Sequence, residues 1–117
     1  MKKILVVDDD QDLLIVLKSF LGKNGFDVGV TTSCGEGLSI FYSFQPDLVL
    51  LDINVGNEDG REMCKEIKTH ADYQHIPVMV MSANHEVLKF HHDYYADAYL
   101  EKPFKLSYLL QALKTHV

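Results

Sequence analysis

The chain has few of the features that mark secreted, membrane-spanning or nucleic-acid-binding proteins. Its 117 residues include only two cysteines, without metal-ligand or redox spacing, so we expect Cys34 and Cys64 to be small core residues in a reducing compartment. Its apolar stretches, such as Leu48 to Leu51, are far shorter than the ~20 residues of a bilayer span. Seventeen acidic residues against eleven basic ones argue against binding to a polyanion. We therefore expect a cytoplasmic domain with no direct contact to nucleic acid or membrane.

Internal repeats, low-complexity tracts and linker-like segments are absent as well, which leaves residues 1–117 as a single domain. A chain of this length can bury roughly two thirds of its unfolded surface. What does recur is a change of hydrophobic period. Short apolar runs suited to strands alternate five times with stretches whose apolar residues fall at helical spacing. This alternation predicts an α/β fold.

The apolar runs predict five strands of one parallel sheet. The runs from Ile4 to Val7 and from Leu48 to Leu51 are unbroken, which is typical of central strands covered on both faces. The run from Phe26 to Val30 alternates apolar and polar positions and therefore indicates an edge strand. The remaining strands are predicted at Ile76 to Met81 and at Ala98 to Leu100.

A helix is predicted after each strand. The cleanest helical stripe lies within residues 106–117, and a capping box of Ser33 and Glu36 opens the second helix. The poorest helical pattern covers residues 84–93, whose inward candidates are only Val87, Leu88 and His91. Because crossovers between parallel strands are right-handed, these elements limit the fold to a few doubly wound sheets, in which the run from Phe26 to Val30 lies outside the first strand.

The carboxyl ends of the strands carry the candidate site, because ligands of doubly wound sheets bind there. The side chains that we expect to meet at this edge are Asp8, Asp9, Asp52, Ser82 and Lys102. Two carboxylates about 4 Å apart repel by roughly 4 kcal/mol at an effective dielectric constant of about 20, so three acids call for a cation. Oxygen ligands without histidine or thiolate favour magnesium over zinc.

A magnesium site beside an ammonium and a hydroxyl group suits a bound phosphoryl group. Lys102 would supply a mobile positive charge and Ser82 a hydroxyl donor, and Asp52 would then be the acceptor. Carboxylates are covalent nucleophiles in phosphoryl transfer, where the protein mainly positions the reactants and neutralises charge. A simpler interpretation is a helix N-terminus, where acids complement the helix dipole. For Asp10 the sequence supports helix capping and a role in the site equally.

Four motifs give the chain a specific resemblance over essentially its whole length. They are Val6-Val7-Asp8-Asp9-Asp10, Asp52 followed by Asp59-Gly60, Val80-Met81-Ser82-Ala83, and Tyr99-Leu100-Glu101-Lys102-Pro103-Phe104. In this order they resemble the receiver domain of two-component response regulators, the CheY-like family. The resemblance implies a flavodoxin-like, doubly wound α/β fold with five parallel strands in the order 2-1-3-4-5 and five flanking helices. It also implies a phosphoacceptor signalling domain, not a turnover enzyme, which assists its own phosphorylation and dephosphorylation.

The resemblance also implies the partners and the metal ligands. Asp52 would accept a phosphoryl group from a phosphohistidine on a sensor histidine kinase or a histidine phosphotransfer protein. Asp9 and Asp52 would bind Mg²⁺ directly together with the backbone carbonyl of Asn54, and Asp8 would act through a water molecule. An output domain or effector, and a phosphorylation-dependent homodimer, are further partners that the family suggests.

The switch residues are implied in the same way. Lys102 would pair first with Asp52 and then with the phosphoryl oxygens, and Ser82 would donate its hydroxyl to them. Tyr99 would then swing inward behind Ser82. The family also has a cis peptide bond before the proline that follows this lysine, here Pro103.

Two positions depart from the family pattern. Val55 and Gly56 stand three and four residues after Asp52, where the family often has a hydrophobic residue and a proline, so the loop loses the proline's restraint. Tyr95 stands where a glycine is common, which we expect to alter the exit from the fourth helix.

Other functions compete with the signalling switch. A phosphohydrolase resembling the haloacid dehalogenase family would use Asp8 as nucleophile and Asp10 as acid/base, but that family has a threonine or valine where this chain has Asp12. It also has a cap or a larger core. A flavodoxin-like flavin carrier could share the strand order, but the first loop lacks the phosphate cradle of that class. We expect the six histidines to be surface residues, with His91 and His92 on opposite sides of a helical turn.

Overall fold

The structure is a computed structural model that describes residues 1–117. Its centre is a five-stranded parallel sheet in the order β2-β1-β3-β6-β7. The strands are β1 (Lys3–Val7), β2 (Asp27–Thr31), β3 (Leu48–Asp52), β6 (Val78–Ser82) and β7 (Ala98–Glu101). Because β4 and β5 form a separate hairpin, this order is the predicted 2-1-3-4-5, and the doubly wound fold is confirmed.

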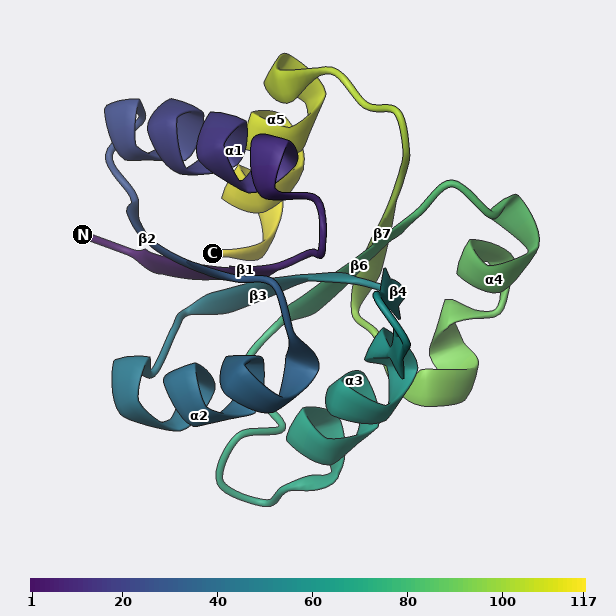
Figure 1. Ribbon diagram of the computed structural model, residues 1–117. Helices are drawn as coiled ribbons and strands as arrows, with labels where there is room; N and C mark the ends of the chain where they lie inside the picture. Colours follow the sequence, from purple (N-terminus) through teal and green to yellow (C-terminus); the bar gives the residue numbers. More distant parts are fainter.

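Helices cover both faces of the sheet (Figure 1). One face carries α1 (Gln11–Lys23) and α5 (Leu106–His116), and the other carries α2 (Cys34–Phe44), α3 (Gly60–Thr69) and α4 (His85–Lys89). A short 3₁₀ helix, η1 (His91–Tyr94), follows α4. No helix has the length and apolar character needed to cross a membrane.

The two layers have separate buried cores because side chains of a strand alternate between the faces. In β1, for example, Ile4 and Val6 contact the layer of α1 and α5, whereas Leu5 and Val7 contact the layer of α2 and α3. Both central strands, β1 and β3, are buried almost throughout, and β2 at the edge is only partly covered, as their patterns predict. Cys34 and Cys64 are both buried and unpaired, as expected of small core residues.

Side chains at the predicted positions begin the helices. The carboxylate of Asp10 accepts the backbone N–H of Leu13 at 3.1 Å, so Asp10 is the N-cap of α1. Ser33 Oγ accepts the N–H of Glu36 at 3.2 Å and opens α2 as the capping box predicts. Helix capping therefore accounts for Asp10. Asp8 and Asp9 remain candidates for the site at the carboxyl ends of the strands.

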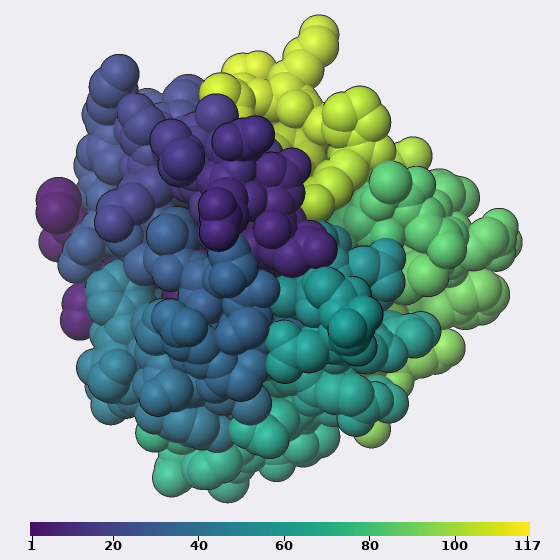
Figure 2. All heavy atoms as spheres, in the orientation of Figure 1, coloured from purple at the N-terminus to yellow at the C-terminus, as the bar shows by residue number.

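The loop that carries Val55 and Gly56 contains a short hairpin. Asn54–Val55 (β4) and Glu58–Asp59 (β5) pair antiparallel in a short hairpin, with Gly56 at φ +61° in its turn. Val55 is buried and anchors this hairpin in the core. The hairpin reaches the surface beside the segment that links β1 to α1 and beside α4 (Figure 2).

The fourth helical segment is shorter than predicted. The α-helix ends at Lys89, and within this stretch Leu88 is fully buried while Val87 and His91 are only partly covered. Beyond this helix Tyr94 is also buried, and its hydroxyl donates to the Val87 carbonyl at 3.0 Å.

The end of this segment differs from the prediction at the two histidines. The placement of His91 and His92 on opposite sides of a turn is wrong, because the 3₁₀ geometry brings their ring centroids to 4.0 Å. Tyr95 does occupy the exit of the segment, with φ +67°, which is the left-handed conformation that a glycine adopts without strain.

Candidate functional site

Parallel pairing brings the predicted site residues to one edge of the sheet. Asp8 directly follows β1, Asp52 is the last residue of β3, Ser82 is the last residue of β6, and Lys102 directly follows β7. The register keeps these ends level, because Val7 lies beside Leu51, Asp52 beside Met81, and Ser82 beside Glu101. All four side chains therefore belong to the carboxyl-end edge.

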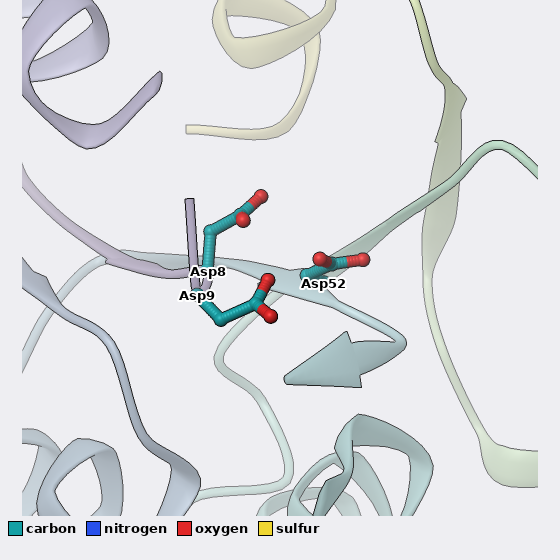
Figure 3. A group of neighbouring side chains, drawn as sticks. All are labelled: Asp8, Asp9 and Asp52. Atoms are coloured by element: carbon teal, nitrogen blue, oxygen red, sulfur yellow. The ribbon is translucent and has the colours of Figure 1, made fainter. Parts of the chain in front are cut away.

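Three carboxylates form the centre of this edge. Asp8, Asp9 and Asp52 each offer one oxygen, and these oxygens lie within 4.8 Å of one another. Figure 3 shows the three side chains next to one another at the ends of β1 and β3. Asp8 is fully buried and Asp52 is 6% exposed, whereas Asp9 is exposed to solvent. The cluster is thus enclosed by protein on one side and open to water at Asp9.

Lys102 is the counter-charge of the buried acids. Its Nζ donates to Asp8 Oδ2 at 2.7 Å and to Asp52 Oδ2 at 3.3 Å, so the lysine that was expected to pair with Asp52 lies closer to Asp8. Burial by itself lowers the pKa of Lys102, but the hydrogen bond to Asp8 and the charges of both acids outweigh it and raise the pKa. The ammonium therefore stays protonated. The Lys102–Pro103 peptide bond is cis.

The charges of the cluster do not cancel. Burial, and then the charge of Asp8, raise the pKa of the Asp52 carboxyl to about 6, although Lys102 and the Asn54 N–H oppose that rise. Three carboxylates face one ammonium, which leaves two negative charges without a counter-charge within the cluster. A divalent cation would offset this charge.

The donor set fits magnesium. All three side-chain donors are carboxylates, without histidine or thiolate, and the exposed position of Asp9 leaves room for the water molecules that Mg²⁺ retains. Asn54 lies at the same edge, where its backbone N–H donates to Asp52 Oδ1 at 3.3 Å. Asp8, Asp9 and Asp52 are therefore the side chains that could hold the ion, and the carbonyl of Asn54 stays a predicted fourth ligand.

Ser82 and Tyr99 are placed differently from each other. Ser82 is 2% exposed, and its Oγ accepts the Asn84 N–H at 2.9 Å, which leaves the hydroxyl hydrogen available for donation. Tyr99 lies on the outside of β7 with 46% of its surface exposed, and its ring centroid is 5.0 Å from that of His91. This structure therefore shows Tyr99 in an outward position, and its inward movement stays a prediction.

Two glycines near Asp52 have contacts that the sequence did not reveal. Gly60 opens α3, and its N–H donates to the Ile53 carbonyl at 2.7 Å, so the helix start lies directly on the end of β3. Gly56 donates its N–H to Asp9 Oδ2 at 3.1 Å. The Asp59-Gly60 pair was visible as a motif, but its closeness to Asp52 depends on how the hairpin folds back.

Comparison with known proteins agrees with this geometry. The family described as response regulator receiver domain matches residues 4–114. The transcriptional regulatory protein YxdJ of Bacillus subtilis is 31% identical over 121 residues, which cover 100% of this chain and 51% of that protein. The response regulator MprA of Mycolicibacterium vanbaalenii is 35% identical over 114 residues, or 96% of this chain and 48% of that protein. The chain thus spans about half the length of these curated relatives.

A solved structure shows the same fold. The CheY-like response regulator receiver domain protein of Methanospirillum hungatei matches with a TM-score of 0.87 and 31% identity. The match covers 98% of this chain and 92% of that one.

Proposed function

The chain belongs to the response regulator receiver domain family of two-component signalling, and we propose that Asp52 is the residue that accepts the phosphoryl group. One observation carries the proposal. The buried Asp52 carboxylate has an oxygen within 4.8 Å of oxygens of two further acids, and Asp52 Oδ2 lies 3.3 Å from the ammonium of Lys102. A carboxylate in such surroundings can act as a nucleophile toward phosphorus once its negative neighbours are neutralised.

The phosphoryl donor is a phosphohistidine on a sensor histidine kinase or a histidine phosphotransfer protein. An oxygen of Asp52 forms the new P–O bond while the P–N bond to the imidazole breaks. The electron pair of the broken bond leaves with the nitrogen, which takes a proton from solvent. No oxidant or reductant takes part, and Asp52 needs no base because its carboxyl is ionised at neutral pH, above the pKa of about 6.

Magnesium held by Asp8, Asp9, Asp52 and the carbonyl of Asn54 would supply positive charge to the phosphoryl oxygens. The residues of the chain provide the rest. Asp8 keeps the Lys102 ammonium at the site through the 2.7 Å contact, and this ammonium can move from the carboxylates to a phosphoryl oxygen. The Ser82 hydroxyl, whose hydrogen is not used in the contact with Asn84, would donate to a second phosphoryl oxygen.

Phosphorylation then shifts the domain between two conformations. Donation by Ser82 draws the end of β6 toward the phosphoryl group, and Tyr99 moves from its exposed position into the space behind Ser82. This changes the face formed by α4, β7 and α5, where an output domain, an effector or a second phosphorylated copy would bind. We place the domain in the cytoplasm, where its two unpaired cysteines stay reduced.

The proposal predicts magnesium-dependent phosphorylation that requires Asp52. Incubation with acetyl phosphate and Mg²⁺ should add the mass of one phosphoryl group to the intact protein, as measured by native mass spectrometry. EDTA should abolish the gain. Asp52→Asn should reduce it to the level seen with EDTA, because an amide oxygen is a far weaker nucleophile than a carboxylate.

Asp27→Asn is the matched control. Asp27 is an exposed acid at the start of the edge strand β2, far from the carboxyl ends of the strands. This variant should gain the phosphoryl group as the wild type does. An equal gain in Asp52→Asn and in the wild type would overturn the proposal.

A further inference from the structure

The hairpin of β4 and β5 contacts the acid cluster through its backbone. Its first strand donates the Asn54 N–H to Asp52 Oδ1 at 3.3 Å. Its turn donates the Gly56 N–H to Asp9 Oδ2 at 3.1 Å, across 47 residues of sequence. One short element thus connects two candidate metal ligands, one in the segment after β1 and one at the end of β3.

Asp9 depends on this contact more than the other two acids do. Asp8 is fully buried, and it accepts hydrogen bonds from the Lys102 ammonium and from the Asp10 N–H. Asp52 is held by Lys102 and by Asn54. The exposed Asp9 carboxylate accepts only the hydrogen bond from Gly56 and has no ion pair. Without that bond its side chain would be free to rotate into solvent.

The hydrogen bond to Asp9 requires a particular backbone conformation at residue 56. Gly56 has φ +61°, and a Cβ there would meet no atom within 4 Å. Space therefore does not require glycine, whereas the left-handed conformation favours it. A proline, which the related family often has here, would fix φ near −65° and would have no N–H to donate. Because this chain has Gly56 where the family often has a proline, it has a backbone N–H that can donate a hydrogen bond at this position.

We propose that Gly56 is a positioning residue, whose N–H fixes the Asp9 carboxylate in the orientation that binds the divalent cation. The inference rests on the proposed function, because it assumes that the three acids hold magnesium. A hydrogen bond to a ligating carboxylate orients it before the metal arrives, and loss of such a bond typically weakens metal binding by about 10- to 100-fold.

The test compares two variants at position 56. Gly56→Pro removes the donor and the left-handed conformation, whereas Gly56→Asn keeps the N–H and tolerates positive φ. The measurement is the dissociation constant for Mg²⁺ by isothermal titration calorimetry, with far-UV circular dichroism as a check of folding. We expect Gly56→Pro to raise the dissociation constant by about 10- to 100-fold and Gly56→Asn to restore a value near that of the wild type.

A third variant separates the hydrogen bond from the backbone conformation. An ester in place of the Val55–Gly56 amide replaces the N–H with an oxygen without adding a side chain, and Cys64 offers a ligation junction for assembling such a chain from two synthetic segments. The ester should weaken Mg²⁺ binding as Gly56→Pro does. Unchanged or tighter binding in the ester variant would overturn the inference, because the N–H would then be idle or would compete with the ion. A wild type that does not bind Mg²⁺ would overturn the proposed metal site instead.

Discussion

Replacing Gly60 with alanine is expected to destabilise the fold by roughly 3 kcal/mol and to weaken Mg²⁺ binding at the same time. A Cβ at this position would overlap the backbone oxygen of Asp52 and would stand 3.2 Å from Ile53 Cα. Both obstacles are backbone atoms of the segment that carries the proposed acceptor, so no side-chain rotation relieves them. The start of α3 must move away from β3, and the 2.7 Å hydrogen bond from Gly60 to Ile53 is lost. Urea unfolding and Mg²⁺ titration measure the two effects.

Gly22→Ala is the control for this prediction. Gly22 lies near the end of α1, and a Cβ there would meet no atom within 4 Å. Alanine is the better helix former, so this variant should gain about 0.5 to 1 kcal/mol and should bind Mg²⁺ as the wild type does. If Gly60→Ala were as stable as Gly22→Ala, the close packing of α3 on the acceptor strand would be refuted.

Lys102→Met is expected to lower the stability of the metal-free protein by about 3 kcal/mol at neutral pH, the cost typical of removing one partner from a buried ion pair. Asp8 is fully buried and has its ammonium partner at 2.7 Å, so the variant leaves a buried carboxylate without a counter-charge. A divalent cation can replace the lost charge. Saturating Mg²⁺ should therefore raise the melting temperature of Lys102→Met by more than it raises that of the wild type.

Lys68→Met provides the matched comparison. Lys68 forms an ion pair with Asp97 at 2.8 Å, near the amino ends of β6 and β7, and its side chain is 8% exposed. This variant also loses an ion pair, but it has no acid cluster beside the vacated position. It should be destabilised without any added response to Mg²⁺. An equal Mg²⁺ response in both lysine variants would contradict the assignment of the metal to Asp8, Asp9 and Asp52.

The sheet was predictable because its determinants are local. The unbroken apolar runs of β1 and β3 indicate strands covered on both faces, and helical crossovers force these strands to be parallel. Parallel strands bring their carboxyl ends to one edge, so Asp8, Asp52 and Lys102 could be placed together from their positions in the sequence. The alternation of Phe26 to Val30 likewise identified the edge strand.

Other features cannot be predicted from the spacing of apolar residues along the sequence. Strands of two residues, such as Asn54–Val55, are too short to show a period, so the sequence pattern indicates only a loop there. The core position of Tyr94 follows from the 3₁₀ turn after Lys89, where the helical period breaks. Which carboxylate Lys102 approaches more closely, and which way Tyr99 points, are set by side-chain rotamers and by the contacts around them.

The measurement that tests the central claim most directly is to identify the residue that carries the phosphoryl group in the wild-type protein. After incubation with acetyl phosphate and Mg²⁺, borohydride reduces an aspartyl phosphate to homoserine, which peptide sequencing by mass spectrometry can locate. The account predicts homoserine at position 52, and at no other acid. Homoserine at Asp8, Asp9 or a surface acid, with aspartate intact at position 52, would contradict it.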